Sequence, residues 1–309
     1  MASTSPTDMA TGGEWGGERL DLAAYLERIG DPGDPRPELE TLIAMHRAHV
    51  TSIPFENLDI VLGRGISLEL EDLQTKLVRR RRGGYCYEHG LLFAAALERI
   101  GFSLIRLIAR VNPRRPEPGP RTHMLARVPI DGRPWLADVG FGAGLLEPIP
   151  LEAGTTVDQE GWHYRLERDG EGAWLAAARQ GEQWSDLYAF TLERQRPIDY
   201  VVANHFTQTH PRSPFVGQPV AFSNAIGVRH RLKGLELRIE RPDGGHEQRE
   251  LTTRERDEAL REIFGIVLSP PDLAALPSRA RRPEAKPGST DSRGTSPPWP
   301  FARTPSHPR

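Results

Sequence analysis

The sequence predicts an α+β fold made of a helical domain, an antiparallel β-barrel domain and an α/β domain. Three observations predict it: apolar residues at helical spacing in the first third, β-rich runs around a hairpin turn in the middle, and mixed patterns after residue 200. With 309 residues and 38% hydrophobic content, the chain can bury a sizeable core. We expect a disordered leader at 1–17, a helical domain at 18–101, a β-barrel domain at 102–200, an α/β domain at 201–277 and a disordered tail at 278–309.

Helical spacing recurs up to Gly101. Leu20 to Gly30 carries apolar residues on one face and ends at a glycine, and Leu39 to His46 repeats the pattern after a Pro/Gly/Asp turn. Asp72 to Arg80 and Cys86 to Ile100 complete the set. The first domain is therefore expected to be mainly helical.

Strand patterns follow Gly101. Ser103 to Val111 is β-rich, and two further runs, Thr122 to Ile130 and Trp135 to Val139, flank Asp131-Gly132, a dipeptide typical of a two-residue hairpin turn. Further short strands are expected at 161–168, 173–179 and 184–190, which together favour a small antiparallel sheet or barrel.

The last third mixes both patterns. A short helix is expected near Pro197, strands at 219–228 and 235–240, and a helix at 252–264 that starts at a threonine cap. From Ser278 onward, Pro, Ser, Arg and Gly dominate without periodicity, which is typical of disorder.

Charge and apolar runs exclude two partner classes. A net charge of -2 provides no basic field for nucleic acid, and no apolar run is long enough to span a membrane. The N-terminal segment lacks the order of a secretory signal, and one cysteine cannot form an internal disulfide. We therefore expect a cytoplasmic protein, and the oligomeric state stays open.

The single cysteine, Cys86, lies in the run Arg82-Gly-Gly-Tyr-Cys-Tyr-Glu-His-Gly90, directly before an apolar helical stretch. The unpaired N–H groups at a helix N-terminus favour a thiolate, which is the form that attacks carbonyl carbon. Cysteine nucleophile chemistry is therefore the first hypothesis. A lone cysteine near a helix start is also typical of a small buried hydrophobic residue.

The hairpin supplies a base and a group to orient it. A turn at Asp131-Gly132 sets a register that pairs Ile130 with Arg133, Leu125 with Asp138, and His123 with Gly140. His123 and Asp138 then become diagonal neighbours on one face, with Cβ atoms about 7 Å apart. Asp138 would accept the proton of one ring nitrogen, and the other nitrogen would face Cys86.

Simpler interpretations stand beside this triad. His89 is a competing base, because it lies three residues after Cys86 and shares its helix face. Asp138 alone would be an ordinary strand-end carboxylate. His205 and His210 are too loosely spaced for a metal site, and no metal site is proposed.

These residues resemble the arylamine N-acetyltransferase family. The resemblance covers about residues 18 to 275, and its ordered blocks are Arg82 to His89, Thr122-His123, Trp135 to Gly142, Ile53 to Leu58, Asp199 to Asn204 and Thr209 to Phe215. It implies a papain-like Cys-His-Asp core, in which the α/β domain acts as a lid. The implied catalytic triad is Cys86, His123 and Asp138.

The resemblance also implies a chemistry. The enzyme would be an acyltransferase that moves acetyl from acetyl-CoA, through a cysteine thioester, to the nitrogen of arylamines, arylhydroxylamines or hydrazines. Acetyl-CoA would be a co-substrate, and no cofactor would be bound permanently. The implied acceptor pocket is formed by Phe55, Val111, Phe141 and Phe215, and the implied CoA contacts are Thr122 and Gly142.

Two further details come from the resemblance. It implies a buried pair between Glu56 and Arg82. It also marks a departure, because this chain has Gly90 where the family usually has Asn, and a glycine there weakens the helix by about 0.5 to 1 kcal/mol.

Three other functions stay open at this point. The first is an amide synthase that closes a polyketide macrolactam on an aromatic amine and keeps the same triad. The second is a cysteine hydrolase of transglutaminase or papain type. The third is a binding protein without catalysis, which the three filled triad positions disfavour.

Overall fold

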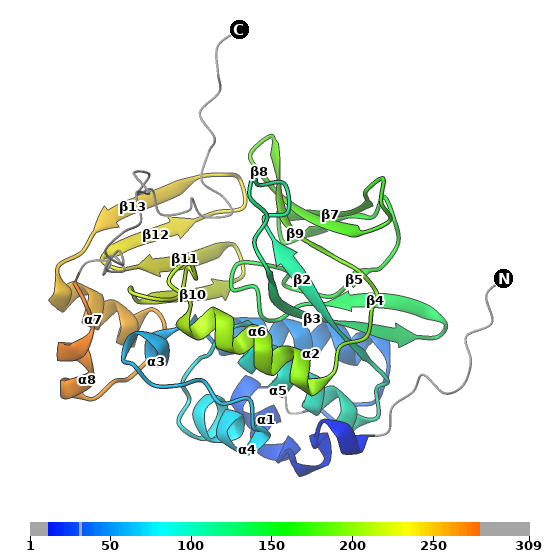
Figure 1. Ribbon diagram of the computed structural model, residues 1–309, viewed down its shortest axis with the longest axis horizontal. Helices are drawn as coiled ribbons and strands as arrows, with labels where there is room; N and C mark the ends of the chain where they lie inside the picture. Colours follow the sequence, from blue (N-terminus) through cyan, green and yellow to red (C-terminus); the bar gives the residue numbers. More distant parts are fainter. Residues whose placement is uncertain (1–11, 31–32, 279–309) are drawn as a thin grey trace, which may run out of the picture.

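The computed structural model describes residues 12–30 and 33–278. Helices of the first third lie in one half of the molecule, and two antiparallel sheets lie in the other, with helix α6 crossing in front (Figure 1). The α-helices are α1 (Leu22–Ile29), α2 (Leu39–Ser52), α3 (Leu58–Val61), α4 (Leu70–Leu73), α5 (Cys86–Ile100), α6 (Pro197–Thr209), α7 (Thr253–Glu262) and α8 (Pro270–Ala275). The other helical elements are the 3₁₀-helices η2 (Gly12–Glu14) and η3 (Gly17–Arg19) and the π-helix η4 (Gln74–Arg79).

The larger sheet is a nearly closed antiparallel barrel. Its strands run in the order β5 (Ile149–Pro150), β4 (Arg133–Ala137), β3 (Arg121–Ile130), β2 (Ile105–Val111), β9 (Gln183–Phe190), β8 (Trp174–Gln180), β7 (Trp162–Arg168) and β6 (Thr156–Gln159).

The smaller sheet belongs mostly to the last third of the chain. Its order is β1 (Phe55–Glu56), β10 (Val220–Ala225), β11 (Val228–Lys233), β12 (Glu236–Glu240) and β13 (His246–Glu250). Strand β1 comes from the helical segment and pairs with β10, so the first and third segments share one sheet.

The predicted hairpin is confirmed. Strands β3 and β4 pair from Ile130 with Arg133 to Ala126 with Ala137, which is the predicted register. Asp131 and Gly132 have φ of 49° and 77°, the left-handed conformation of a type I′ turn. Strand β4 ends at Ala137, one residue before Asp138.

Two other expectations were wrong in part. Residues 12–17, expected to be disordered, form turns in which Trp15 stacks its ring under the Arg106 guanidinium and packs on Tyr200. The strand expected at 219–228 is interrupted at Ile226-Gly227, where Gly227 has φ of 74° and turns the chain from β10 into β11. The expected ends at 1–11 and 279–309 lie outside the described residues.

The core has three parts, one of which contains Cys86. The largest joins α1, α2 and α5 to one face of the barrel. A second lies around Cys86 and under α6, and a third joins the smaller sheet to α7 and α8. None of the described helices is both long and apolar enough to cross a lipid bilayer.

The hairpin turn generates a test of stability. Substituting Gly132→Ala should lower the free energy of unfolding by about 1 to 2 kcal/mol, because an L-residue pays that penalty in the left-handed conformation. Urea denaturation measures it. Gly119→Ala is the matched control, since both sites have open space around a Cβ but only Gly132 has positive φ. Equal effects of the two substitutions would contradict the assigned turn.

Candidate functional site

Cys86 is the first residue of α5, so its thiol lies at the positive end of the helix macrodipole. The side chain is buried, with 4% exposed, and Sγ lies 3.5 Å from the Thr122 carbonyl oxygen. Glu88 closes the helix start, because its Oε2 accepts the Tyr85 N–H at 2.9 Å. The helix start is thus held against strand β3.

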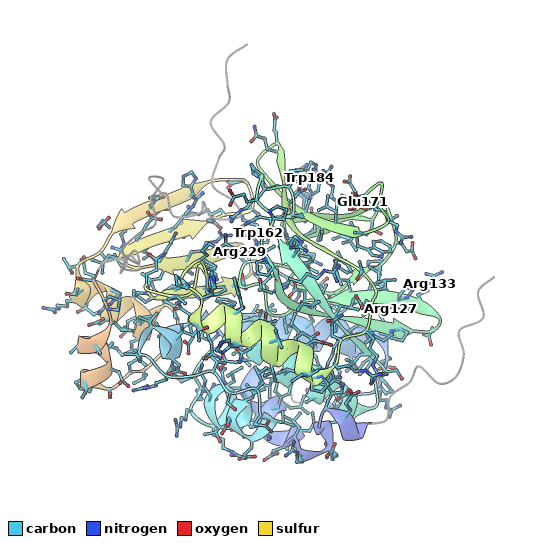
Figure 2. All side chains as sticks on the ribbon, viewed as in Figure 1. Arg127, Arg133, Trp162, Glu171, Trp184 and Arg229 are labelled. Carbon is cyan, nitrogen blue, oxygen red and sulfur yellow. The ribbon has the colours of Figure 1, made fainter. Side chains whose placement is uncertain are left out.

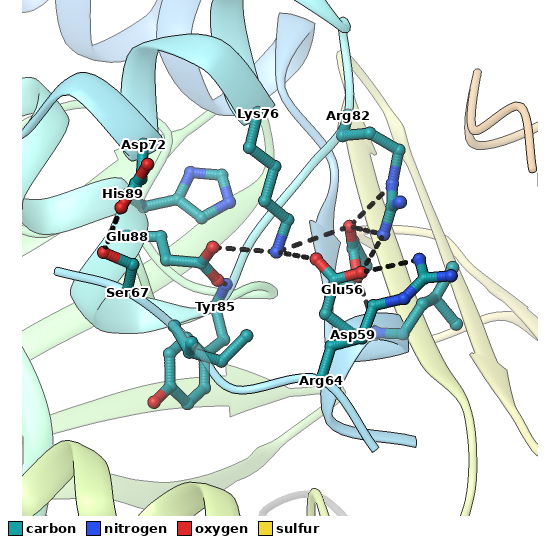
Figure 3. A network of polar contacts seen from close by, with 12 residues as sticks. Glu56, Asp59, Arg64, Ser67, Asp72, Lys76, Arg82, Tyr85, Glu88 and His89 are labelled. Atoms are coloured by element: carbon teal, nitrogen blue, oxygen red, sulfur yellow. Dashed lines mark hydrogen bonds and ion pairs between the residues drawn. The ribbon is translucent and has the colours of Figure 1, made fainter. Parts of the chain in front are cut away.

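A buried ionic network lies behind this helix start (Figure 3). The Lys76 ammonium is 2.7 Å from Glu88 and 2.8 Å from Asp59. Burial raises the pKa of Glu88 to about 7, against the opposing effect of Lys76. Lys76 therefore compensates a carboxylate that has little contact with water.

The expected pair between Glu56 and Arg82 is part of the same network (Figure 3). Oε1 of Glu56 accepts from Arg82 Nη2 at 2.6 Å and from Nε at 3.1 Å. The other oxygen accepts the Leu58 N–H at 2.6 Å. The segment that carries Phe55 is therefore fixed to the loop before Cys86.

The structure brings His123 and Asp138 together beside Cys86. His123 Nε2 lies 2.8 Å from Asp138 Oδ2, and since a carboxylate only accepts, Nε2 carries the proton. The second ring nitrogen is left for the hydrogen bond between His123 and Cys86. Cys86, His123 and Asp138 thus form one connected set of a thiol, an imidazole and a carboxylate.

The electrostatics of this set favour an imidazolium. Burial lowers the pKa of His123, but the charge of Asp138 and hydrogen bonds to Asp138 and Cys86 outweigh it and raise the pKa to about 10. Burial raises the pKa of Asp138, whereas His123 and the Gly140 N–H lower it more, so the pKa ends below its usual value. A protonated ring beside the thiol stabilises a thiolate.

Asp138 is held on several sides although it lies beyond the end of β4. Its Oδ1 accepts the Gly140 N–H at 3.1 Å, and its own N–H donates to Nε2 of His46 at 3.1 Å. Gly140 also explains how the loop reaches Cys86. A Cβ at Gly140 would lie 2.8 Å from the Cys86 carbonyl oxygen, so no side chain fits there.

His89, the competing base, is engaged elsewhere. Its Nε2 lies 3.2 Å from the Pro54 carbonyl, and its Nδ1 lies 2.8 Å from His49 Nε2. Tyr25 Oη then lies 2.8 Å from His49 Nδ1. The Pro54 carbonyl only accepts, so His89 Nε2 donates to it and His89 Nδ1 accepts from His49. Each neutral ring thus donates at one nitrogen and accepts at the other, and Tyr25 donates to His49. Burial lowers the pKa of His89 to about 4, so its ring is neutral at pH 7.

The four residues expected in the acceptor pocket fall into two groups, one around Phe55 and one around the His123 ring. Phe55 and Phe215 pack together at 5.6 Å between ring centroids, and Phe222 stacks on Phe55 at 5.2 Å. Phe141 instead packs edge-on against the His123 ring at 5.1 Å. Val111, at the end of β2, pairs in register with Tyr188, which also packs on His123.

Of the two expected CoA contacts, Thr122 lies against Cys86, and Gly142 lies against Phe222 and Phe55. The Thr122 carbonyl oxygen lies 3.5 Å from Cys86 Sγ and accepts from the Tyr87 hydroxyl at 2.8 Å. Gly142 has φ of 86°, and a Cβ there would lie 2.4 Å from the Phe222 ring. Its carbonyl accepts from Asn224 Nδ2 at 2.7 Å.

The smaller sheet clamps the loop that follows Asp138. Arg229 of β11 donates to the Ala143 carbonyl at 3.1 Å and to the Gly144 carbonyl at 2.7 Å. Its guanidinium lies 3.8 Å from the centre of the Trp162 ring, and both side chains are labelled in Figure 2. The barrel and the smaller sheet therefore meet at this loop.

Gly90 has a local explanation. A Cβ at this position would lie 2.8 Å from Met124 Sδ, the residue that follows His123. The missing side chain thus makes room for Met124 against α5. Within the described residues, no group of three or more His, Cys, Asp or Glu side chains could hold a metal ion.

Sequence reasoning missed His46, Gly140 and Phe222. Gly140 carried a signal, since glycines on both sides of Phe141 indicate close backbone packing. His46 was only one polar residue in a helical pattern. Phe222 looked like an ordinary core residue of a strand.

Known proteins are similar to this chain over most of its length. The profile of a family described as N-acetyltransferase matches residues 38–273. A protein of Mycolicibacterium smegmatis named arylamine N-acetyltransferase is 42% identical over 270 residues, which cover 85% of this chain and 97% of the relative.

Solved structures are equally similar. The crystal structure of the Nocardia farcinica arylamine N-acetyltransferase has a TM-score of 0.82 and 46% identity, and covers 85% of this chain and 95% of that chain. The Mycobacterium marinum arylamine N-acetyltransferase in complex with CoA has a TM-score of 0.75 and 37% identity, and covers 80% and 93%. These similarities confirm the expected papain-like α+β fold.

The raised pKa of His123 predicts a pH dependence of stability. A base with a pKa raised from 6.5 to about 10 contributes stability that is fully present below pH 6.5 and is lost as the pH rises through 10. The gap in unfolding free energy between wild type and His123→Gln should therefore shrink by up to about 1.4 kcal/mol per pH unit over this range. Urea denaturation at several pH values measures the gap. A gap that does not change with pH would refute the ion pair.

The buried network generates a second prediction. Lys76→Met should lower the free energy of unfolding by about 3 to 5 kcal/mol, because it leaves buried Glu88 without its cation. The loss should be larger at pH 8 than at pH 5.5, where Glu88 can take up a proton. Thermal and urea denaturation measure both effects. Arg254→Met removes an exposed ion pair as a control and should change little; a pH-independent loss in Lys76→Met would contradict the prediction.

Proposed function

Because the chain belongs to the arylamine N-acetyltransferase family, we propose that Cys86 carries an acetyl group from acetyl-CoA to the nitrogen of an arylamine, arylhydroxylamine or hydrazine. The observation that supports this proposal is the connected set of Cys86, His123 and Asp138 at the start of α5. The reaction runs in two half-reactions with one covalent intermediate.

In the first half-reaction, the Cys86 thiolate, which is paired with the protonated His123 ring, attacks the acetyl carbonyl carbon. A bond forms between Sγ and that carbon, and the bond from the carbon to the CoA sulfur breaks. The departing CoA thiolate takes the proton from His123. The products are free CoA and an acetyl thioester on Cys86.

In the second half-reaction, the amine nitrogen attacks the thioester carbon and gives a proton to His123. The bond between carbon and Cys86 Sγ breaks, and Cys86 leaves as a thiolate beside the protonated ring, which restores the starting ion pair. Asp138 takes no proton in either step. Its role is to hold the ring by Nε2 and to stabilise the imidazolium that forms.

The surroundings suit these substrates. We propose that Phe55, Val111, Phe141 and Phe215 contact the flat acceptor, since aromatic walls favour an aryl ring. Thr122 and Gly142 would contact the donor, and the M. marinum relative was solved with CoA. We also expect activity in the cytoplasm, where a reducing environment keeps Cys86 free.

The proposal predicts a covalent intermediate. Incubation with acetyl-CoA and no amine should add one acetyl group to the protein, visible in the intact mass, and a peptide map should place it on Cys86. Later addition of an aryl amine or hydrazine should remove the group and release the acetylated amine.

Two variants sharpen this experiment. Cys86→Ala should gain no acetyl group, and His123→Gln should gain it far more slowly. Wild type that gains nothing while its thiol is reduced would refute the acetyl-CoA assignment. A thioester that turns over without any amine would identify a hydrolase, and slow acetyl uptake combined with rapid uptake of longer acyl chains would favour an amide synthase.

A further inference from the structure

We infer that His46 is a positioning residue, which holds the backbone of Asp138 so that its carboxylate stays on His123. The inference rests on the proposed function, because it assigns a role toward the triad. His46 lies on α2, far in sequence from both strands of the hairpin, and its ring is fully buried.

The hydrogen bonds of the His46 ring define one tautomer. Nδ1 lies 3.0 Å from the Leu146 carbonyl oxygen, and a carbonyl only accepts, so Nδ1 carries the proton. Nε2 then presents a lone pair, which accepts the Asp138 N–H at 3.1 Å. Both ring nitrogens are used, one at each end of the loop from Asp138 to Leu146.

Asp138 needs an acceptor at this point. The ladder between β3 and β4 ends at the pair of Ala126 and Ala137, so the next N–H along β4 lies beyond the paired residues. A buried N–H without an acceptor destabilises the folded chain, because it loses its hydrogen bond to water and gains none in return. His46 supplies the acceptor, and in doing so it fixes the turn of the chain that aims the Asp138 carboxylate at His123.

The ring stays neutral over the working range. Burial lowers the pKa of His46 to about 4, and the charge of Asp138 offsets this only in part. The ionisable groups that interact with the His46 ring are Asp138 and His49, which lies on the same helix. On its other side the ring meets Phe93 of α5 edge-on at 5.8 Å, so the same residue ties α2 and the Cys86 helix to the loop.

His49 offers a matched control. It lies one turn further along α2 and is also fully buried, and burial also lowers its pKa. Its ring nitrogens contact Tyr25 and His89, and not Asp138. A general loss of packing in α2 would therefore affect variants of both histidines.

The test measures alkylation of Cys86 by iodoacetamide between pH 5.5 and 9.5 in the full chain. An ordinary thiol, with a pKa of about 8.5, reacts slowly at pH 6, whereas a thiolate paired with an imidazolium still reacts. The readout is the ratio of the rates at pH 6 and pH 9.5. This ratio does not depend on any acyl donor.

Three variants separate the possible roles. His46→Asn keeps a donor near the Nδ1 position and loses the acceptor for Asp138, so its ratio should fall severalfold, and by at most about tenfold for a loss of thiolate stabilisation worth one pKa unit. His46→Gln places an amide oxygen near the Nε2 position and should restore the wild-type ratio. His49→Asn should retain the wild-type ratio.

Each outcome decides the question. A wild-type ratio in His46→Asn overturns the inference, as does an equal fall in His49→Asn or a failure of His46→Gln to restore the ratio. If His46→Asn does not fold, His46→Leu takes its place, because it also removes the acceptor for Asp138: the same fall is expected, and a wild-type ratio in His46→Leu overturns the inference. Failure of the proposed function appears separately: wild type would gain no acetyl group from acetyl-CoA, although its Cys86 is still alkylated at pH 6.

Discussion

The hydrogen bond between His123 and Asp138 sets the protonation state of the ring beside Cys86. It joins two residues at the open end of one hairpin, and it turns a buried imidazole into a group that retains its proton. This proton acts on Cys86 only because the first residue of helix α5 packs against the same hairpin. Gly140 allows the two backbones to approach closely, since it has no side chain. The chemistry therefore depends on two segments being held together closely, one mainly helical and one built of strands.

The buried charges around Cys86 are paired with groups of opposite charge. On one side Asp138 and His123 compensate one another, and on the other Lys76 compensates Glu88 and Asp59. Pairs of this kind gain little net stability over an apolar core, but each fixes the position of its members strongly, because a partner left alone is costly. The histidines of α2 follow another rule, since burial keeps them neutral and leaves their lone pairs available as acceptors.

Local patterns predicted most of this arrangement, and long-range packing accounts for the rest. The dipeptide Asp131-Gly132 fixes the pairing register of β3 and β4 through turn geometry alone. The contact between His123 and Asp138 could therefore be predicted from the sequence. The contact between His46 and Asp138 joins residues 92 positions apart, and no local pattern encodes it. The prediction of a single strand at 219–228 was wrong. Gly227 was the one local sign of a turn within an otherwise β-rich run. The domain boundaries remain predictions.

Strand β1 has a consequence for how this fold can be divided. Phe55 and Glu56 come from the helical segment, yet they pair with Phe222 and Ala221 at the edge of the smaller sheet. Asn57 extends the connection, since its side chain bonds the Phe215 carbonyl and the Val220 N–H. The third segment is thus not a self-contained module. A chimera that exchanges it between relatives would have to carry the Phe55–Asn57 segment with it, because the seam between the parts runs through a sheet and not through a linker.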